Sequence, residues 1–193
     1  YDAMHGMKHW AHFITKDFQT FDRGDLLIPD ELFESHGCYS GGAILWEDQI
    51  VAFYTGNTRR PSDNARIPHQ NIAIFDKSGK LLEKRCIIDK APNGYTEHVR
   101  DPKPYVTKEG KIRFVLGAQR ENLTGTCLVY EMDNLQDTPR LIGELSVQDF
   151  NNEHVFMWEC PDLFQLGGKD CFVWSPQGKL REANRFQNNY HAT

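Results

Sequence analysis

The chain has 193 residues, of which 39% are hydrophobic and 25% are charged, and its 22 basic and 27 acidic side chains give a net charge of −5. This composition is typical of a globular protein with a sizeable core, and it excludes the basic surface that nucleic-acid binding requires. No apolar run approaches the roughly 20 residues that cross a bilayer, so no membrane partner is expected.

The cysteines indicate a reducing compartment. There are five of them, they are widely spaced, and no Cys-x-x-Cys pair occurs. An odd number of separated cysteines predicts free thiols rather than a disulfide framework, and therefore a cytoplasmic protein. The chain begins with Tyr1 rather than Met and shows no signal segment, so we interpret residues 1–193 as a fragment of one longer domain.

Five β-hairpins are predicted, each from two apolar runs joined by a short polar turn. Residues 1–40 and 57–70 carry little strand signal, no helix has a clear periodicity, and we expect 57–70 to form a long loop between hairpins. In chain order the predicted strands are residues 43–46 and 50–54, 71–75 and 81–88, 103–106 and 112–116, 126–130 and 141–145, and 162–166 and 171–174.

The hairpins repeat along the chain. Turns centred near residues 48, 109 and 168 alternate with turns near 78 and 135, which gives a period of about 60 residues. Two hairpins per repeat supply four antiparallel strands, the content of one propeller blade. The sequence therefore predicts an all-β fold, a partial β-propeller of about 2.5 to 3 blades. A β-sandwich is the alternative all-β interpretation, but it does not explain the repeat.

Three polar motifs follow the same spacing, each just before a predicted strand. Ser40 and Asp101 are 61 positions apart, and Asp101 and Glu159 are 58 apart. Because the blades of a propeller direct equivalent positions toward one axis, we expect these side chains to share a pocket. Two carboxylates facing one pocket are the minimum for cleaving a glycosidic bond. The motifs are Tyr39-Ser40-Gly41-Gly42, Arg100-Asp101-Pro102 and Trp158-Glu159-Cys160-Pro161.

The chemistry expected of Asp101 follows from its neighbours. Pro102 should keep Asp101 extended, and the adjacent Arg100 should lower the pKa of the Asp101 carboxyl group. A carboxylate that stays charged suits the stabilisation of a sugar ring. The alternative is a surface ion pair at the start of a strand.

The neighbours of Glu159 are apolar. Phe156, Met157 and Trp158 precede it, and an apolar setting raises the pKa of a carboxyl group because desolvation disfavours its charged form. A carboxylic acid that keeps its proton near neutral pH can serve as a general acid. The alternative is an ordinary polar residue at the start of a strand.

Tyr39 and Ser40 precede two glycines, which would let a ligand approach the backbone, although a tight turn explains them equally well. Trp10 could line a sugar pocket or belong to the core.

The spacing of His5, His9 and His12 would place three imidazoles on one helix face. No cysteine or carboxylate completes a recognisable metal site, so neither a metal nor another cofactor is expected.

Five segments of the chain resemble glycoside hydrolase family 32, a family of invertases, fructan hydrolases and sucrose-6-phosphate hydrolases. The stretches 54–59 and 173–178 are most similar to the bacterial sucrose-6-phosphate hydrolases. The resemblance implies a five-bladed β-propeller that hydrolyses the β-fructofuranoside bond of sucrose or sucrose-6-phosphate with retention. The segments are His9-Trp10-Ala11-His12, Tyr39-Ser40-Gly41-Gly42-Ala43, Tyr54-Thr55-Gly56-Asn57, Arg100-Asp101-Pro102 and Trp158-Glu159-Cys160-Pro161.

The resemblance also implies roles for individual residues. Glu159 would be the acid/base, and Asp101 would stabilise the transition state by binding fructosyl hydroxyls. The family's nucleophile is an Asp in an Asn-Asp-Pro motif, and this chain contains no such motif. We therefore expect the nucleophile and the first blade upstream, the last blade and a C-terminal β-sandwich downstream, and no activity from this fragment alone. The expected substrate-binding residues are Trp10, Tyr39, Ser40, Arg100 and Cys160.

Three questions stay open at this point. Tyr39 and Gly42 stand where the family more often has Phe and Ser, which affects the details of fructose contact. A non-catalytic carbohydrate-binding or interaction propeller is the alternative function, and a related arabinan- or xylan-cleaving hydrolase fits the Glu-Cys motif less well. The sequence does not decide whether the substrate is phosphorylated. Solvated surface charge is the favoured interpretation of each candidate phosphate ligand, and these candidates are Lys8, Arg59, Arg60 and Arg66.

Overall fold

The computed structural model describes residues 7–180 and 190–193, and in that part of the chain antiparallel strands dominate. A two-stranded sheet of β1 (Phe13–Ile14) and β2 (Asp22–Arg23) precedes a single 3₁₀ turn, η1 (Leu32–Glu34). Within the described ranges, no helix has the length and apolar character to cross a membrane.

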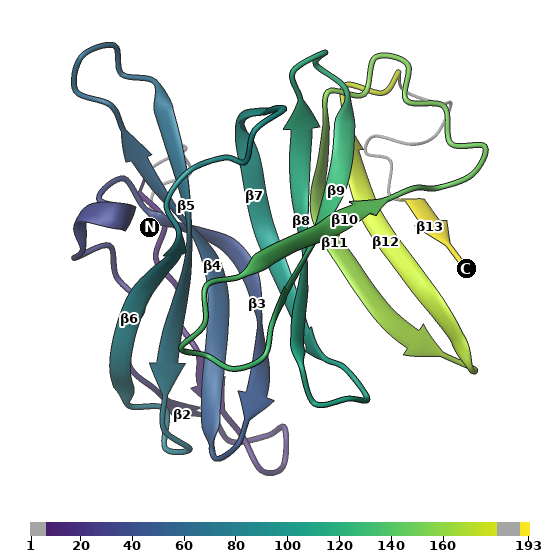
Figure 1. Cartoon of the computed structure of the whole chain (residues 1–193). Helices are drawn as coiled ribbons and strands as arrows, with labels where there is room; N and C mark the ends of the chain where they lie inside the picture. Colours follow the sequence, from purple (N-terminus) through teal and green to yellow (C-terminus); the bar gives the residue numbers. More distant parts are fainter. Residues whose placement is uncertain (1–6, 181–189) are drawn as a thin grey trace.

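Three larger sheets follow in chain order (Figure 1). The first two have four strands each, hydrogen-bonded in sequence order, and the third has three described strands. The first sheet contains β3 (Cys38–Trp46), β4 (Gln49–Arg59), β5 (Arg66–Phe75) and β6 (Leu81–Ile88). The second contains β7 (Tyr95–Val106), β8 (Ile112–Arg120), β9 (Gly125–Met132) and β10 (Arg140–Leu145). The third contains β11 (Met157–Leu166), β12 (Lys169–Gln177) and β13 (Tyr190–Ala192).

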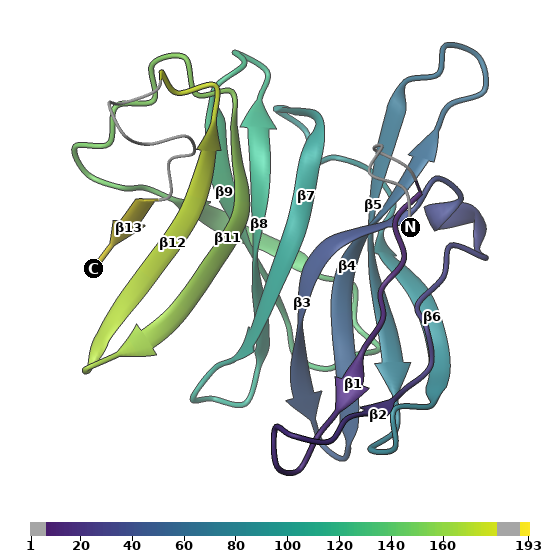
Figure 2. The ribbon, with the colours of Figure 1, turned by 180° about the vertical axis from the view of Figure 1, so that it is seen from behind.

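The second sheet is covered on both faces. Because side chains alternate along a strand, Phe114 of β8 packs with Phe53 and Ile72 of the first sheet, whereas the adjacent Val115 packs with Trp158 and Trp174 of the third. Figure 2 shows the same succession of sheets from behind. Three sheets packed in series are successive propeller blades, and the two-sheet sandwich alternative is wrong.

All five predicted hairpins are confirmed, and their pairing into four-stranded sheets is confirmed as well. Gly79 and Gly110 have positive φ in their turns, as hairpin glycines often do. The long loop expected over residues 57–70 is wrong, because 57–59 continue β4 and 66–70 begin β5. Arginine, proline and histidine weaken the strand pattern here, while the pairing of Arg59 with Arg66 shows that the ladder continues.

The three polar motifs lie inside strands rather than before them. Each sits in the first strand of its sheet, where the pairing register shifts after Cys38, after Arg100 and after Glu159. β7 contacts β3 on one side and β11 on the other, so these first strands are neighbours. A bulge redirects the side chains around it, and three bulges on adjacent strands gather the motifs into one region.

A buried charge cluster ties η1 to the first sheet. The fully buried Glu34 carboxylate accepts hydrogen bonds from Lys84 on β6 and from the Tyr54 hydroxyl on β4. Lys84 also pairs with Asp30, and the Cys38 thiol lies 3.5 Å from Glu34. Because a buried charge is costly unless it is paired, loss of Lys84 should destabilise the fold by about 3–5 kcal/mol.

Candidate active site

Asp101 lies at the junction of all three sheets. It sits in the β7 bulge with φ +65°, and only 6% of the residue is exposed. Its Oδ2 accepts a hydrogen bond of 2.9 Å from the backbone N–H of Cys160 on β11. Its own N–H donates to the hydroxyl of Thr55 on β4, at 3.0 Å. Both the backbone and the carboxylate of Asp101 are therefore fixed by neighbouring sheets.

Two expectations about Asp101 are wrong. Its φ lies in the left-handed region, so Pro102 does not hold it extended. Its pKa is raised rather than lowered, because burial disfavours the charge more than the Cys160 N–H and Arg100 favour it. The sequence shows Arg100 beside Asp101, but it does not show that the guanidinium pairs with another carboxylate.

That other carboxylate is Glu159. Oε1 of Glu159 accepts hydrogen bonds from Nε of Arg100 at 3.1 Å and from Nη2 at 2.6 Å. The Glu159 side chain is 31% exposed. The apolar surroundings expected for Glu159 are wrong, because Met157 and Trp158 are buried in packed interfaces while Glu159 faces the guanidinium.

His98 completes this polar group. Nη1 of Arg100 lies 3.2 Å from Nδ1 of His98. Burial lowers the pKa of His98, and the nearby Arg100 and Arg66 lower it further. A neutral imidazole accepts the Arg100 hydrogen bond at Nδ1 and adds no charge to the site.

The predicted aromatic residues form a second group. The indole N–H of Trp10 donates to the Tyr39 carbonyl at 3.1 Å, and Nδ2 of Asn57 lies 3.4 Å from the Tyr39 hydroxyl. The Arg66 guanidinium stands 5.8 Å from the centre of the Tyr39 ring. Ser40 is exposed next to Tyr39 on β3. Arg66 lies between the group around Tyr39 and the group around Arg100, because the charges of Arg100 and Glu159 both shift the pKa of Arg66.

The glycines after Ser40 are explained by packing. A Cβ on Gly41 would lie 1.9 Å from the Phe53 carbonyl oxygen, which is far inside van der Waals contact. A Cβ on Gly42 would lie 2.7 Å from the Lys103 side chain on β7. Gly41 is therefore required by the approach of β3 to β4 at the bulge.

The four candidate phosphate ligands differ in what their side chains or backbones contact. Arg60 pairs with Asp63 within the exposed turn between β4 and β5, and Arg59 donates to a backbone carbonyl of the same turn. Lys8 contributes its backbone carbonyl to the Cys38 N–H. Only Arg66 has its charged group beside the motif residues.

The histidine spacing does not build a metal site in the part of the chain that the structure describes. His12 packs edge-on against Phe75, and no group of three metal-ligating residues occurs among residues 7–180 and 190–193. His5 lies outside the described residues.

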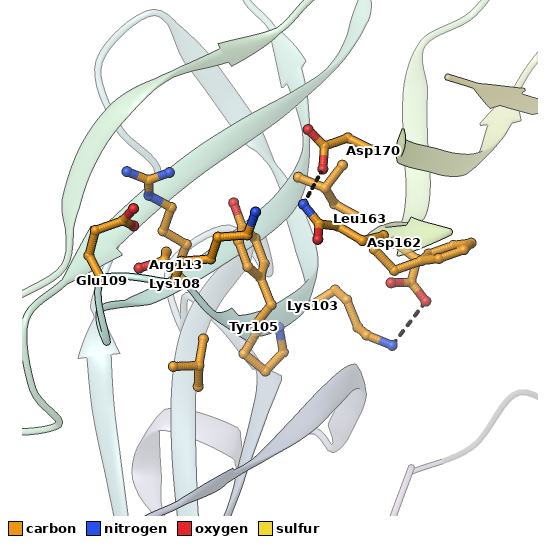
Figure 3. Close-up of a pocket in the computed structure, with 13 residues that line it drawn as sticks. Lys103, Tyr105, Lys108, Glu109, Arg113, Asp162, Leu163 and Asp170 are labelled. Carbon is orange, nitrogen blue, oxygen red and sulfur yellow. Dashed lines mark hydrogen bonds and ion pairs between the residues drawn. The ribbon is translucent and has the colours of Figure 1, made fainter. Parts of the chain in front are cut away.

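A pocket of about 610 Å³ opens between the second and third sheets, toward the hairpin ends of β7 and β11 (Figure 3). Lys103 and Asp162 form an ion pair of 2.9 Å at this pocket. Neither Asp101 nor Glu159 lines it, so its size alone does not make it the site. The candidate site is the region at the bulges, where two carboxylates and an arginine converge.

The whole chain, residues 1–193, matches the model of the glycosyl hydrolases family 32 N-terminal domain. The chain belongs to glycosyl hydrolase family 32. It is 40% identical over 191 residues to a sucrose-6-phosphate hydrolase of Bacillus subtilis (strain 168), covering 97% of this chain and 39% of that protein. It is 37% identical to the sucrose-6-phosphate hydrolase of Klebsiella pneumoniae, covering 97% and 40%.

Solved structures of family members have the same fold. The sucrose-6-phosphate hydrolase of Lactobacillus gasseri superposes with a TM-score of 0.84 at 29% identity, over 98% of this chain and 39% of that one. A mutant β-fructofuranosidase of Bombyx mori in complex with sucrose gives a TM-score of 0.77 at 29% identity, over 95% and 39%. The chain thus spans about two fifths of the length of the relatives it matches.

Proposed function

We propose that the protein carrying this chain is a retaining glycoside hydrolase that cleaves the β-fructofuranoside bond of sucrose or sucrose-6-phosphate. The observation that carries the proposal is the convergence of Asp101 and Glu159 from different sheets. The Asp101 carboxylate binds the backbone N–H of the residue that follows Glu159, so the two acids stand at one place. Family membership and relatives named sucrose-6-phosphate hydrolase support this substrate class.

Glu159 acts as the acid/base in this proposal. In the first step its carboxylic acid gives a proton to the glycosidic oxygen while an aspartate nucleophile forms a bond to the fructosyl anomeric carbon; the bond from that carbon to the glycosidic oxygen breaks, and the glucosyl group leaves as an alcohol. In the second step a water attacks that carbon, the bond to the nucleophile breaks, and the Glu159 carboxylate takes the proton of the water. The partial exposure of Glu159 allows substrate to reach it. We propose that the nucleophile comes from sequence outside residues 1–193.

Asp101 binds the substrate and transfers no proton. Its Oδ2 is occupied by the Cys160 N–H, and it is anchored from both sides, which suits a fixed acceptor for fructosyl hydroxyls. Arg100 holds the Glu159 carboxylate in place with two hydrogen bonds. Cys160 acts through Asp101, because its N–H binds the carboxylate. Partial desolvation and the nearby Asp101 charge raise the pKa of the Cys160 thiol to about 12, so the thiol stays protonated.

The position of Arg66 supports a phosphorylated substrate. Its guanidinium lies beside Tyr39, and among the described residues no carboxylate forms an ion pair with it. A guanidinium binds phosphate through charge-assisted hydrogen bonds, and burial already lowers the pKa of Arg66, so an anion there would relieve an unfavourable charge.

The proposal is tested with the whole protein, including any sequence that flanks residues 1–193. Release of fructose from sucrose or sucrose-6-phosphate, with retention seen by NMR during turnover, is the expected result. A protein that binds fructosides without cleaving them would instead support the non-catalytic carbohydrate-binding alternative.

A further inference from the structure

A chain of buried hydrogen bonds links the first sheet to the backbone of Asp101. The Thr55 hydroxyl accepts the Asp101 N–H at 3.0 Å and donates to Oε1 of Gln70 at 2.8 Å. Nε2 of Gln70 then donates to the carbonyl of Val99 at 3.1 Å. Thr55 and Gln70 are paired across β4 and β5, so together they hold β7 at two points on either side of Arg100.

The bond from Asp101 to Thr55 replaces one that the second sheet does not make. The β7–β8 register is interrupted between Arg100 and Lys103, which leaves the Asp101 N–H without a partner on β8. Asp101 also has φ +65°, which an aspartate adopts at a cost unless its surroundings impose it. An unpaired buried N–H would add a further cost, and the Thr55 hydroxyl removes it.

Burial and hydrogen bonding fix the side chains of Thr55 and Gln70 in one arrangement. Thr55 is 2% exposed, Gln70 is 1% exposed and Val99 is 2% exposed. The threonine hydroxyl uses its hydrogen for Gln70 and a lone pair for Asp101, so the direction of each bond is fixed. On the opposite side, Cys160 binds the carboxylate of the same aspartate. Asp101 is thus held by hydrogen bonds to the first sheet and to the third sheet.

We infer that Thr55 and Gln70 are positioning residues, which hold the Asp101 bulge so that its carboxylate faces the fructosyl ring. The inference rests on the proposed function, since Asp101 must act in catalysis for its position to matter. A displacement of about 1 Å at such a group costs roughly 100-fold in rate. The effect should fall mainly on kcat, because a misplaced acceptor weakens the transition state more than the bound substrate.

The test compares Thr55→Val with Thr55→Ser in the whole protein. The valine removes the hydroxyl and keeps the shape, and it should lower kcat on sucrose by roughly 10- to 100-fold while KM changes less than about threefold. The serine keeps the hydroxyl and should restore kcat to within about threefold of the unmodified enzyme. If Thr55→Val does not fold, Thr55→Ala makes the same deletion in a smaller side chain.

Thr126→Val is the matched control. Thr126 is another fully buried threonine, and its hydroxyl bonds Glu144 and Arg120 rather than the Asp101 bulge. Its loss should lower the melting temperature and leave kcat unchanged. Equal kcat losses in Thr55→Val and Thr126→Val would overturn the inference, as would an unchanged kcat in Thr55→Val. An unmodified protein without fructosidase activity would instead overturn the proposed function.

Discussion

The β7 bulge and the β11 bulge each carry a carboxylate, but at different positions and in opposite settings. Asp101 is 6% exposed and is anchored through its backbone and its carboxylate, whereas the Glu159 side chain is 31% exposed and meets a single guanidinium. Asp101 takes the left-handed position of its bulge (φ +65°), which Cys160 takes in β11 (φ +47°), while Glu159 lies one residue earlier. One bulge therefore carries a fixed acid and the other an accessible acid. A fixed acceptor suits transition-state binding, and an accessible acid suits proton transfer to a leaving group.

Removal of the accessible acid should have the largest effect. Glu159→Gln removes the transferable proton and should lower kcat on sucrose by about 10²- to 10⁴-fold. On a nitrophenyl β-fructofuranoside, whose leaving group needs no proton, kcat/KM should fall far less than on sucrose in the same variant, because kcat/KM reports the first step, before Glu159 acts as a base. Measurement of kcat/KM on both substrates in the whole protein checks this prediction, and equal losses in kcat/KM would contradict the acid role.

Removal of the fixed group should behave differently. Asp101→Asn takes the negative charge from the transition state and should lower kcat by about 10²- to 10³-fold. The loss should be similar for sucrose and the nitrophenyl substrate, because Asp101 does not act on the leaving group. A loss confined to sucrose would show that the two acids have been assigned in the wrong order.

Replacement of Arg66 should affect the phosphorylated substrate selectively. Arg66→Gln should lower kcat/KM on sucrose-6-phosphate by about 10- to 100-fold and leave sucrose nearly unchanged, since a hydrogen bond to a charged group is worth about 1.5–3 kcal/mol. Arg66→Lys, which keeps the charge but not the fork of donors, should fall between. Parallel losses on both sugars would remove Arg66 from phosphate recognition.

The β3 bulge should depend on its glycine for folding. Gly41→Ala would bring a Cβ within 1.9 Å of the Phe53 carbonyl and should cost more than about 1 kcal/mol of stability. Gly143→Ala is the control, because nothing lies within 4 Å of a Cβ on Gly143 in β10. Thermal melts of both variants compare them, and equal melting temperatures would contradict the close approach of β3 to β4.

Burial of the Asp101 carboxylate should also make the stability of the protein depend slightly on pH. The folded-state pKa of Asp101 is raised by burial, so its protonation favours folding at acidic pH and this contribution is lost as pH rises through that pKa. Asp101→Asn should therefore melt a few degrees higher than the unmodified protein at pH 7. The difference should shrink as pH falls below the usual range of an aspartate, and a lower melting temperature at pH 7 would be contrary to this expectation.

The hairpins could be predicted because alternating apolar runs and turn residues are local signals. The bulges could not, since a register shift depends on which strand lies alongside. Pro102 suggested an extended Asp101, but Asp101 is in the left-handed conformation. Its hydrogen bonds with Thr55 and Cys160, which are 46 and 59 positions away in the sequence, hold it there. Tertiary contacts thus override the local preference at the site.

The approximate spacing of the motifs predicted that Asp101 and Glu159 would lie close together, and the Asp101 carboxylate binds the N–H of Cys160, the residue after Glu159. The partners of these acids were not predictable, because the neighbour in sequence is not the neighbour in space: Arg100 adjoins Asp101 but binds Glu159. Thr55 and Gln70 carried no sequence signal of their own, although Thr55 lies in the Tyr54-Thr55-Gly56-Asn57 segment that resembles the family.

A crystal structure of the Glu159→Gln variant of the whole protein with bound sucrose would show whether both acids act on one sugar. We expect one fructosyl ring whose hydroxyls bind the Asp101 carboxylate, with the side chain at position 159 beside the glycosidic oxygen. Sucrose bound away from Asp101, or bound with position 159 out of reach of the scissile bond, would contradict this arrangement.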